Sequence, residues 1–571
     1  MRWIGVAFMT AWGTGIVAHA APASPTLSDQ AASTVHVWDA FELKLTAQRV
    51  MQNPYVEGLP DDGPAYVTAE FRGESGAAKG QSLTVIGFWD GGATWRVRFA
   101  PPAAGNWSYR TRSADSGLDG RTGTLRAVPW TAAELRANPT RHGFVRVCRH
   151  GPRAGRHFEY ADGTPMLWIG DTWWRWADTR IPFARFEKLV RDRADKGFNV
   201  GQLFFAGRAW QDESSLLDES LTHPFLDHIR HAERMIRYAN AHGITVWVHG
   251  WWGGRDMAKS FGRENLRRWS RYLTHRLGAY NVIWVLAGEY NLYDYGGLGL
   301  DFWKALGRQI KQEDPYDRLL GTHPTPPGWE GGDGAPQWST AEVLHEEPWL
   351  DYHQSQVGHG RWRNELIPDI VAAACAKRPP KPIVVTEPWY EFIEGSASAA
   401  DIRFGAWSAM LSGAAGHSYG GGHIWRAHVP ETPDQGKVWP LERGFERDTL
   451  NYPGARSMAF MAQFLRSLEW WRLAPHPELL HDNPAPFCAA EPGRQYLVYA
   501  RWGGTVWLDL RATPADQTFA FQWIDLVNEK VRQRGTIPGG AIRELDPPEG
   551  YPGTLQCKDW LLHVKRKAVA P

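Results

Sequence analysis

The chain has 571 residues, which is longer than one ordinary domain and predicts about two to four domains. Its 63 basic and 62 acidic residues leave a net charge of +1, so the charge balance gives no reason to expect a nucleic-acid or membrane partner. Hydrophobic residues make up 43% of the chain, enough for packed cores, which excludes a disordered protein. The 32 tryptophans are unusually many. Some suit aromatic β-sandwich cores, and others are typical of sites where an indole covers the C–H face of a sugar.

The N-terminus has the pattern of an export signal. Arg2 precedes an apolar stretch over residues 3–17, and Ala18-His19-Ala20 offers the small residues of a cleavage site. The stretch is too short and too weakly apolar to span a bilayer, and no later segment predicts a transmembrane helix. We therefore expect residues 1–20 to be a signal peptide and the mature protein to be periplasmic or secreted.

Residues 34–130 alternate short apolar runs with turns, which predicts an N-terminal β-sandwich. The expected strands cover residues 68–72, 83–89, 94–99 and 107–111. A connecting segment, residues 131–165, follows.

From residue 166 to residue 470 the pattern changes to alternating strands and helices. Eight strands are expected, over residues 166–170, 198–205, 244–250, 282–289, 318–323, 350–356, 382–387 and 414–419. Eight such units in roughly 300 residues predict a (β/α)8 TIM barrel, an α/β fold. The alternative, an open doubly wound sheet, lacks a G-x-G-x-x-G or Walker-type loop to support it. Residues 471–567 return to short strands, at 495–501, 504–510 and 519–524, and predict a small C-terminal β-domain.

Two of the expected barrel strands end in a glutamate. Residues 282–288 lead to Glu289, and residues 381–386 lead to Glu387, each through an apolar, β-branched run. The carboxyl end of a barrel strand is where catalytic groups are placed. Two opposed carboxylates are the minimum for hydrolysis of a glycosidic bond, so we predict that Glu289 and Glu387 are the catalytic pair. The alternative interpretation is a pair of buried structural carboxylates.

Polar and aromatic residues follow the other strands as well, in the pattern of a sugar pocket. Each of these side chains is interpreted either as a substrate contact or as part of the core. The candidate substrate-binding residues are Asp171, Trp173, Trp174, Arg208, His249, Trp251, Tyr290, Asn291, His323, His353, Gln356, Trp389, Tyr390, Glu391, His417, Tyr419 and Trp425.

Metal and serine-based chemistry are less well supported. His249, His323, His353 and His417 come from different strands, as in barrel metallohydrolases, but the first strand ends in Gly-Asp-Thr and not in His-x-His. There is no H-E-x-x-H motif, and a serine hydrolase would need a G-x-S-x-G elbow that is absent from the sequence. We therefore predict neither a metal nor another cofactor.

The four cysteines do not form a zinc motif. Cys148, Cys375, Cys488 and Cys557 are far apart in the sequence, with no C-x-x-C pair. Cys488 and Cys557 share the C-terminal region and are interpreted either as a disulfide or as two buried thiols.

Several stretches resemble a known family. Ile169-Gly-Asp-Thr-Trp-Trp174, Lys196-Gly-Phe-Asn199, Glu387-Pro-Trp-Tyr-Glu391 and Gly413-Ala-Ala-Gly-His-Ser-Tyr-Gly420 resemble the apiosidase-like glycoside hydrolases. Residues 87–91, 97–99 and 105–107 resemble the β-sandwich often found ahead of such barrels, and residues 471–475 and 497–499 are similar to a collagen-binding-type β-domain. The resemblance implies a (β/α)8 barrel, no cofactor, and Glu289 and Glu387 as the catalytic pair. The family usually has aspartate where this chain has Glu289.

Together these observations predict an exported glycoside hydrolase that cleaves a poly- or oligosaccharide by a retaining mechanism. Glu289 would protonate the leaving oxygen and Glu387 would attack the anomeric carbon. The alternative is a non-catalytic carbohydrate- or matrix-binding protein that uses the same aromatic cleft. The pair of glutamates discriminates between the two, because a binding protein has no need of opposed carboxylates.

The signal-like N-terminus generates a testable prediction. When the full chain is produced with its own N-terminus in an exporting host, the mature protein should begin near Ala21, because the cleavage site ends at Ala20. N-terminal sequencing of the periplasmic or secreted material measures this. Recovery of cytosolic protein that still begins with Met1 would contradict the prediction.

Overall fold

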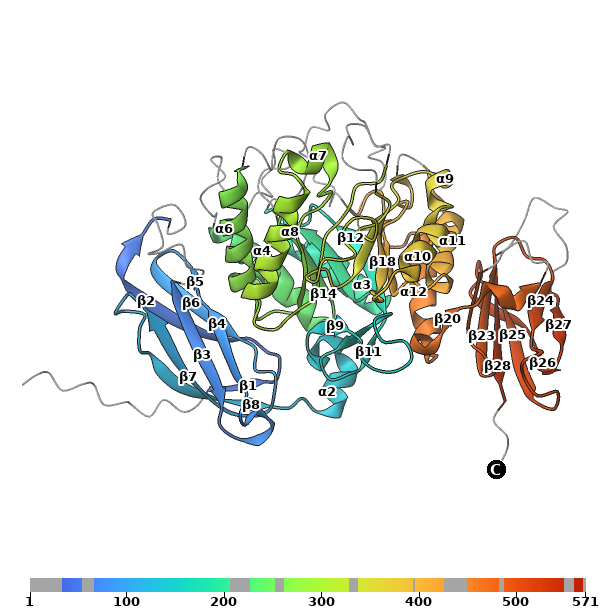
Figure 1. The fold of residues 1–571 in the computed structure, drawn as a ribbon, viewed down its shortest axis with the longest axis horizontal. Coiled ribbons are helices and arrows are strands. Elements are labelled where there is room, and N and C mark those ends of the chain that lie inside the picture. The colour runs from blue at the N-terminus through green and yellow to red at the C-terminus, as the bar shows by residue number, and fades with distance from the viewer. Residues whose placement is uncertain are drawn as a thin grey trace, which may run out of the picture.

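The structure is a computed structural model that describes residues 33–53, 66–179, 181–205, 226–251, 261–327, 337–393, 396–425, 449–481, 487–548 and 559–567. The expected signal peptide therefore lies outside the described residues. Two β-rich parts flank a central α/β barrel, one at each side (Figure 1). The predicted fold class is confirmed. Among the described helices, none combines the length and the apolar character that a membrane crossing requires.

The N-terminal part is a β-sandwich. One sheet has five strands in the order β1-β8-β7-β3-β4, and the other has three strands in the order β2-β6-β5. The strands are β1 (Ser33–His36), β2 (Phe41–Met51), β3 (Val67–Gly73), β4 (Ser82–Ile86), β5 (Phe88–Trp89), β6 (Gly92–Phe99), β7 (Gly105–Ser113) and β8 (Thr122–Val128). Inward residues of the two sheets meet in an aromatic core, where Phe71 stacks on Phe99 at 3.9 Å and Trp107 packs against the same ring.

A small antiparallel sheet then leads into the barrel. It follows α2 (Ala132–Ala137) and contains β9 (Val145–Val147), β10 (Phe158–Tyr160) and β11 (Pro165–Met166). Phe158 and Tyr160 are buried in one cluster with Trp168, Trp247 and other residues from inside the barrel. This sheet therefore closes the amino-terminal end of the barrel.

The central sheet has eight parallel strands in the order β16-β15-β14-β13-β12-β19-β18-β17. The strands are β12 (Trp168–Trp173), β13 (Val200–Phe204), β14 (Thr245–His249), β15 (Val282–Val285), β16 (Leu320–Gly321), β17 (His353–Gln356), β18 (Ile383–Glu387) and β19 (Gly416–Tyr419). Each observed strand overlaps its predicted range, although β15 ends before Glu289. At the seam between β16 and β17, Asp351 closes the barrel, because its amide donates to Leu320 O at 3.0 Å and its carboxylate accepts from Leu320 N at 2.8 Å.

Helices surround the barrel strands, as Figure 1 shows. They are α3 (Phe183–Asp195), α4 (Leu226–Ala241), α6 (Arg263–Leu277), α7 (Leu292–Gly296), α8 (Leu300–Glu313), α9 (Arg361–Asn364), α10 (Ile367–Ala376), α11 (Ala399–Leu411) and α12 (Pro453–Arg466). The helical periodicity follows from apolar residues at intervals of three and four, such as Phe186, Leu189 and Val190 in α3, which are all buried.

The C-terminal part packs a six-stranded sheet, β20-β22-β23-β28-β25-β26, against a three-stranded sheet, β21-β24-β27. The strands are β20 (Ala474–Pro475), β21 (Leu480–His481), β22 (Phe487–Glu491), β23 (Gln495–Ala500), β24 (Val506–Asp509), β25 (Thr518–Asp525), β26 (Lys530–Pro538), β27 (Ile542–Leu545) and β28 (Trp560–Arg566). Cys488 carries a free, buried thiol, as do Cys148 and, less deeply, Cys375. Cys557, the other half of the suggested disulfide, lies outside the described residues.

Buried ion pairs join the three parts. Arg276 of α6 binds Glu233 of α4 at 2.8 Å and Asp90 of the N-terminal sandwich at 3.0 Å. On the other side, Arg403 of α11 binds Asp559 of the C-terminal part at 2.7 Å. Such pairs fix orientation, because removing one partner leaves an uncompensated charge in a dry interface.

One ion pair ties the first barrel strand to the helix that follows it. Asp171 of β12 and Arg193 of α3 are fully buried, and their side chains meet at 2.6 Å. Arg193→Ala should lower the free energy of unfolding by about 3–5 kcal/mol, because it leaves the Asp171 carboxylate buried without its partner. Urea titration followed by tryptophan fluorescence measures the change.

The matched control is Arg191→Ala on the same helix, since Arg191 is exposed and its side chain donates to the Tyr238 hydroxyl in an exposed hydrogen bond. It should change stability by less than about 0.5 kcal/mol. Equal effects of the two substitutions would show that the buried pair has no special role.

Candidate active site

Side chains in the barrel strands alternate between the interior and the surrounding helices, as the period of a strand requires. Trp168 of β12 and Trp174, which directly follows this strand, point inward and are buried with Trp247 of β14. The intervening Trp173 points outward and packs against Phe186 of α3. This alternation decides which of the predicted site residues reach the mouth of the barrel.

Glu387 reaches the interior because the pairing of β17 with β18 is irregular. The register shifts between Ser355, which pairs with Val385, and Gln356, which pairs with Glu387. Regular alternation would send Glu387 outward with Val385, whose side chain is buried against α10. The bulge re-aims the strand end, so that the adjacent residues Thr386 and Glu387 both contact His323.

Histidines and a tyrosine surround the Glu387 carboxylate. His323 Nε2 lies 2.9 Å from Oε2, and His359 Nε2 lies 3.9 Å from Oε1. The ring of Tyr390 lies 4.5 Å from the ring of His359. Burial and the charge of Glu387 raise the pKa of Tyr390 well above its usual range, so this hydroxyl stays protonated. Glu387 therefore sits among groups that can donate hydrogen bonds to an ionised carboxylate.

Glu289 lies in the loop that leaves β15. Its Oε1 accepts a hydrogen bond from Gln356 Nε2 at 3.2 Å. Gln356 is the residue paired with Glu387 across β17 and β18, so the two glutamates flank the same strand end. They are 8% and 6% exposed respectively, so both side chains are largely buried.

The loop that carries Glu289 is strained. Glu289 itself has φ of 45°, in the left-handed region, and Tyr293, Asp294 and Tyr295 follow in the same region. Each non-glycine residue there costs about 1–2 kcal/mol. These are four of the nine such residues in the described part of the chain, so backbone strain is concentrated on the loop after β15. Strain of this kind is typical of functional sites.

Aromatic and histidine rings line the rest of the barrel mouth. Trp174 Nε1 donates to the Tyr390 hydroxyl at 2.7 Å, and the Trp174 ring lies 5.2 Å from His249. The His249 ring lies 5.6 Å from His323, and burial together with the charge of His323 holds the pKa of His249 well below its usual value. Trp389 and Tyr390 form a small cluster against which Trp425 packs.

A glycine allows this packing. A Cβ on Gly420 would lie 2.0 Å from the Tyr390 ring, so any other residue would displace the tyrosine. The structure thus brings together eight predicted residues around Glu289 and Glu387, which are Trp174, His249, His323, Gln356, Trp389, Tyr390, Trp425 and, through its backbone, Trp251.

Four other predicted residues point away from the mouth and form one buried network with α3 and α12. Asp171 accepts hydrogen bonds from Arg193 and from Trp173 Nε1. Glu391 accepts from the Tyr419 hydroxyl at 2.7 Å and from Gly454 N, at the start of α12, also at 2.7 Å. The structure therefore places Asp171, Trp173, Glu391 and Tyr419 among contacts that hold the helices on the barrel.

His353 and His417 also lie on the outer side of their strands. His353 Nε2 faces His345 Nδ1 at 3.1 Å, and burial lowers its pKa to about 3. Burial lowers the pKa of His417 to about 3 as well, so both rings are neutral at ordinary pH. Neither is brought to the two glutamates.

Three predicted residues support the loops of the mouth. The Trp251 carbonyl accepts from Gly288 N, and its ring stacks on Phe261. Tyr290 is fully buried and donates to Gln337, while Asn291 Oδ1 accepts from Thr325 N at 2.8 Å. Arg208 lies outside the described residues.

His359, Thr386 and Trp247 also lie at this site and were not among the predicted site residues. Thr386 and Trp247 lie on predicted strands. Thr386 is two residues from Val384, and Trp247 is two residues from His249. Because residues two apart share one face of a strand, this spacing was the available signal for an inward orientation. His359 lies beyond the predicted end of the sixth strand, and no sequence signal marks it. Within the described ranges, no group of three or more histidine, cysteine, aspartate or glutamate side chains is arranged to hold a metal ion.

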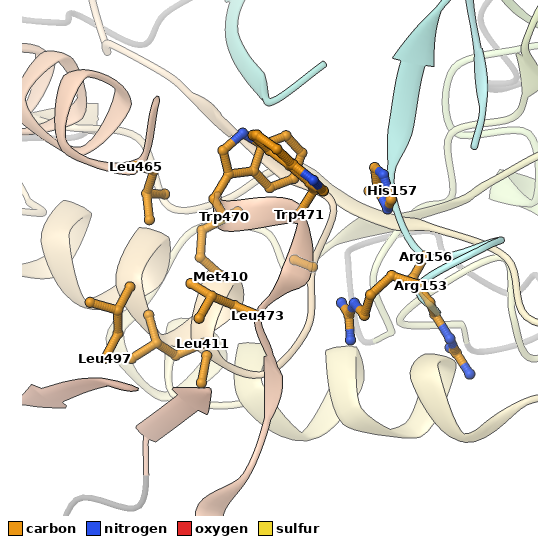
Figure 2. Close-up of a pocket in the computed structure, with 12 residues that line it drawn as sticks. Arg153, Arg156, His157, Met410, Leu411, Leu465, Trp470, Trp471, Leu473 and Leu497 are labelled. Atoms are coloured by element: carbon orange, nitrogen blue, oxygen red, sulfur yellow. The ribbon is translucent and has the colours of Figure 1, made fainter. Parts of the chain in front are cut away.

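A separate small cavity lies at the opposite end of the barrel, next to the C-terminal part. Ala414, which precedes β19, lines it together with residues of α11, α12 and the C-terminal sheet. Figure 2 shows Arg156 and His157 on one side of this cavity and Leu465, Leu411 and Leu497 on the other. Neither glutamate lines it, so it is distinct from the candidate active site.

A parallel barrel with two glutamates at its mouth has the architecture of a barrel glycoside hydrolase. Residues 152–472 match the model of the apiosidase-like catalytic domain, which covers more than half of the chain, so the protein belongs to this family. The match begins at residue 152 and thus includes β10 and β11. Membership confirms the predicted class of enzyme, a glycoside hydrolase. Residues 34–114 match DUF5060, a domain of unknown function.

Solved structures support the fold. A glycoside hydrolase family 5 protein from Bacteroides vulgatus is 20% identical, with a TM-score of 0.64 over 75% of this chain and 94% of the other. A second Bacteroides vulgatus structure, whose glycoside hydrolase activity is itself inferred, is also 20% identical, with a TM-score of 0.67 over 94% of this chain and the whole of the other. At this identity the likeness establishes the shared fold. No curated protein matches the chain.

The contact between His323 and Glu387 can be tested directly. His323→Ala should reduce kcat/KM by about 10²-fold, because the Glu387 carboxylate loses the group that orients it. The loss is measured with a glycoside that the unmodified protein hydrolyses. His353→Ala, on the outer side of the neighbouring strand, is the control and should lower thermal stability while largely preserving kcat/KM. An equal loss of kcat/KM in both variants would contradict a special role for His323.

Proposed function

We propose that this protein is an exported, retaining glycoside hydrolase in which Glu387 is the nucleophile and Glu289 is the acid and base. The observation that carries the proposal is that Gln356, whose side chain donates to the Glu289 carboxylate, is also the residue that pairs with Glu387 between β17 and β18. The export signal falls in the residues outside the described structure, so export rests on the sequence pattern alone.

The surroundings of the two glutamates favour different roles. His323 Nε2 lies 2.9 Å from Glu387 Oε2, so a ring N–H at this nitrogen is able to donate to the carboxylate and orient it for attack. Glu289 Oε1 accepts a hydrogen bond from the neutral amide of Gln356. We assign to Glu289 the proton that the leaving oxygen requires.

The reaction then proceeds in two steps. Glu387 attacks the anomeric carbon while the bond to the leaving oxygen breaks, and Glu289 gives its proton to that oxygen. The product is a covalent glycosyl ester of Glu387. In the second step Glu289 takes a proton from water, the hydroxide attacks the anomeric carbon, and the ester bond breaks to restore the Glu387 carboxylate.

The lining of the mouth supports a sugar as substrate. Trp174, Trp389, Tyr390 and Trp425 offer ring faces for C–H groups. Gln356 Oε1 and Gln202 Oε1 are buried and accept no hydrogen bond from the described residues, so each is able to accept one from a sugar hydroxyl. We propose a poly- or oligosaccharide as substrate. A screen of glycosides and of plant and bacterial polysaccharides would identify it.

The assignment of Glu387 as nucleophile is tested by chemical rescue. Glu387→Gly should lose more than about 10³-fold in kcat on natural glycosides, because no covalent ester can form. Azide should restore turnover by entering the space of the missing carboxylate and should give a glycosyl azide. Proton NMR of the first product decides the mechanism, since an inverted anomeric configuration would show that Glu387 activates water instead.

The assignment of Glu289 as acid is tested with the leaving group. Glu289→Ala should lose about 10²–10⁴-fold on alkyl glycosides, which need a proton on the leaving oxygen. The variant should lose far less activity in the first step on dinitrophenyl glycosides, because dinitrophenolate leaves without a proton. A uniform loss on both substrates would refute the role of Glu289 as the acid. Retention of sugar binding without hydrolysis in the unmodified protein would favour the non-catalytic alternative.

A further inference from the structure

Two tryptophans of the described structure remain exposed to solvent. Trp362 is 59% exposed and Trp502 is 52% exposed. The other strongly exposed large hydrophobic side chains among the described residues are aliphatic, namely Val50, Val527 and Ile542. An exposed indole offers an apolar ring and an N–H donor to a ligand, so these two tryptophans are candidates for a binding surface.

The two indoles lie on either side of one ion pair. Trp362 belongs to α9 and Glu365 is its C-cap, three residues further on and therefore on the same side of the helix. Glu365 Oε1 contacts Arg501 Nη1 at 3.4 Å, and the Arg501 guanidinium lies 4.6 Å from the Trp502 ring. Arg501 also covers Phe404 of α11 at 3.8 Å. The barrel and the C-terminal part thus present a continuous surface between the indoles.

The same surface is connected to the catalytic mouth. Trp362 meets Trp338 edge to face at 6.1 Å, and Arg363 lies over both rings. Arg363 Nη1 lies 3.4 Å from the Val357 carbonyl, and Val357 N donates to the Glu387 carbonyl at 3.1 Å. One short stretch of chain, from β17 to α9, therefore carries both the neighbours of Glu387 and the exposed Trp362.

We propose that Trp338, Trp362 and Trp502 form a tryptophan platform that binds a polysaccharide chain where it leaves the barrel mouth. This inference rests on the proposed function for the position of the cleaved bond, and it deepens that function by making a polymer the substrate. The C-terminal part is then a component of the substrate-binding surface.

The chemistry of the platform fits a carbohydrate better than a protein partner. Arg363 lies against the Trp338 and Trp362 rings, Arg501 lies against Trp502, and Glu365 contacts Arg501, so apolar and hydrogen-bonding groups are mixed over the surface. A sugar chain presents a similar mixture of C–H faces and hydroxyls. A stable protein interface instead needs a contiguous, well-packed patch of about 800 Å² on each partner.

Binding is measured with the full chain carrying Glu387→Gln, so that the polymer is not degraded. Native gels are cast with galactomannan, arabinoxylan, mixed-linkage β-glucan, rhamnogalacturonan or polygalacturonate. At least one polymer should retard the protein, and Trp362→Ala and Trp502→Ala should each weaken the apparent affinity by about fivefold, with a larger loss in the double variant. Trp362→Phe and Trp502→Phe should retain most of the retardation. Val527→Ala, at a side chain that is 48% exposed, is the control and should not change it.

A kinetic comparison separates this proposal from the catalytic one. With Glu387 intact, Trp502→Ala should raise KM on the polymer by about fivefold and have a smaller effect on a short aryl glycoside. Retardation by a polymer that depends on the tryptophans, in a protein without glycosidase activity, would support the platform and refute the proposed function. Hydrolysis with retardation that is unaffected by the double variant would refute the platform alone. The absence of retardation by all five polymers would also overturn it.

Discussion

The candidate active site depends on the break in register between β17 and β18. In a regular strand Glu387 would point toward the helices, where a carboxylate among apolar side chains is costly to bury. The bulge instead turns two consecutive residues, Thr386 and Glu387, toward His323. Tyr390 can then lie against the strand that follows because residue 420 is glycine. One local irregularity thus organises groups from four strands.

Much of the architecture could be predicted from the sequence, because strands and helices differ in hydrophobic period. Eight apolar runs separated by helical patterns were sufficient for a barrel, and two of them led directly to Glu289 and Glu387. The limits of the strands were less predictable. The apolar run before Glu289 looks continuous, but the regular strand ends at Val285, and Glu289 itself has a left-handed backbone conformation.

The direction of each side chain could not be predicted as well as its position. Asp171, Glu391, His353 and His417 all lie on a barrel strand or shortly after one, yet they face outward. Their polarity has another cause, because a barrel of this size needs buried hydrogen bonds between strands and helices. A single sequence does not distinguish a polar residue that serves the active site from one that forms buried hydrogen bonds between strands and helices. His359 was missed for the opposite reason, since it lies on a loop without periodicity.

The left-handed backbone at Glu289 sets a limit on how this enzyme could be engineered for stability. Glycine adopts that conformation without steric cost, so a screen for heat resistance alone would favour glycine at position 289 and eliminate the carboxylate. Asparagine would be the next best tolerated residue and would also abolish the acid. Thermostabilised libraries of this protein should therefore hold position 289 constant, together with the turn at residues 293–295, and look for gains in the two flanking β-rich parts.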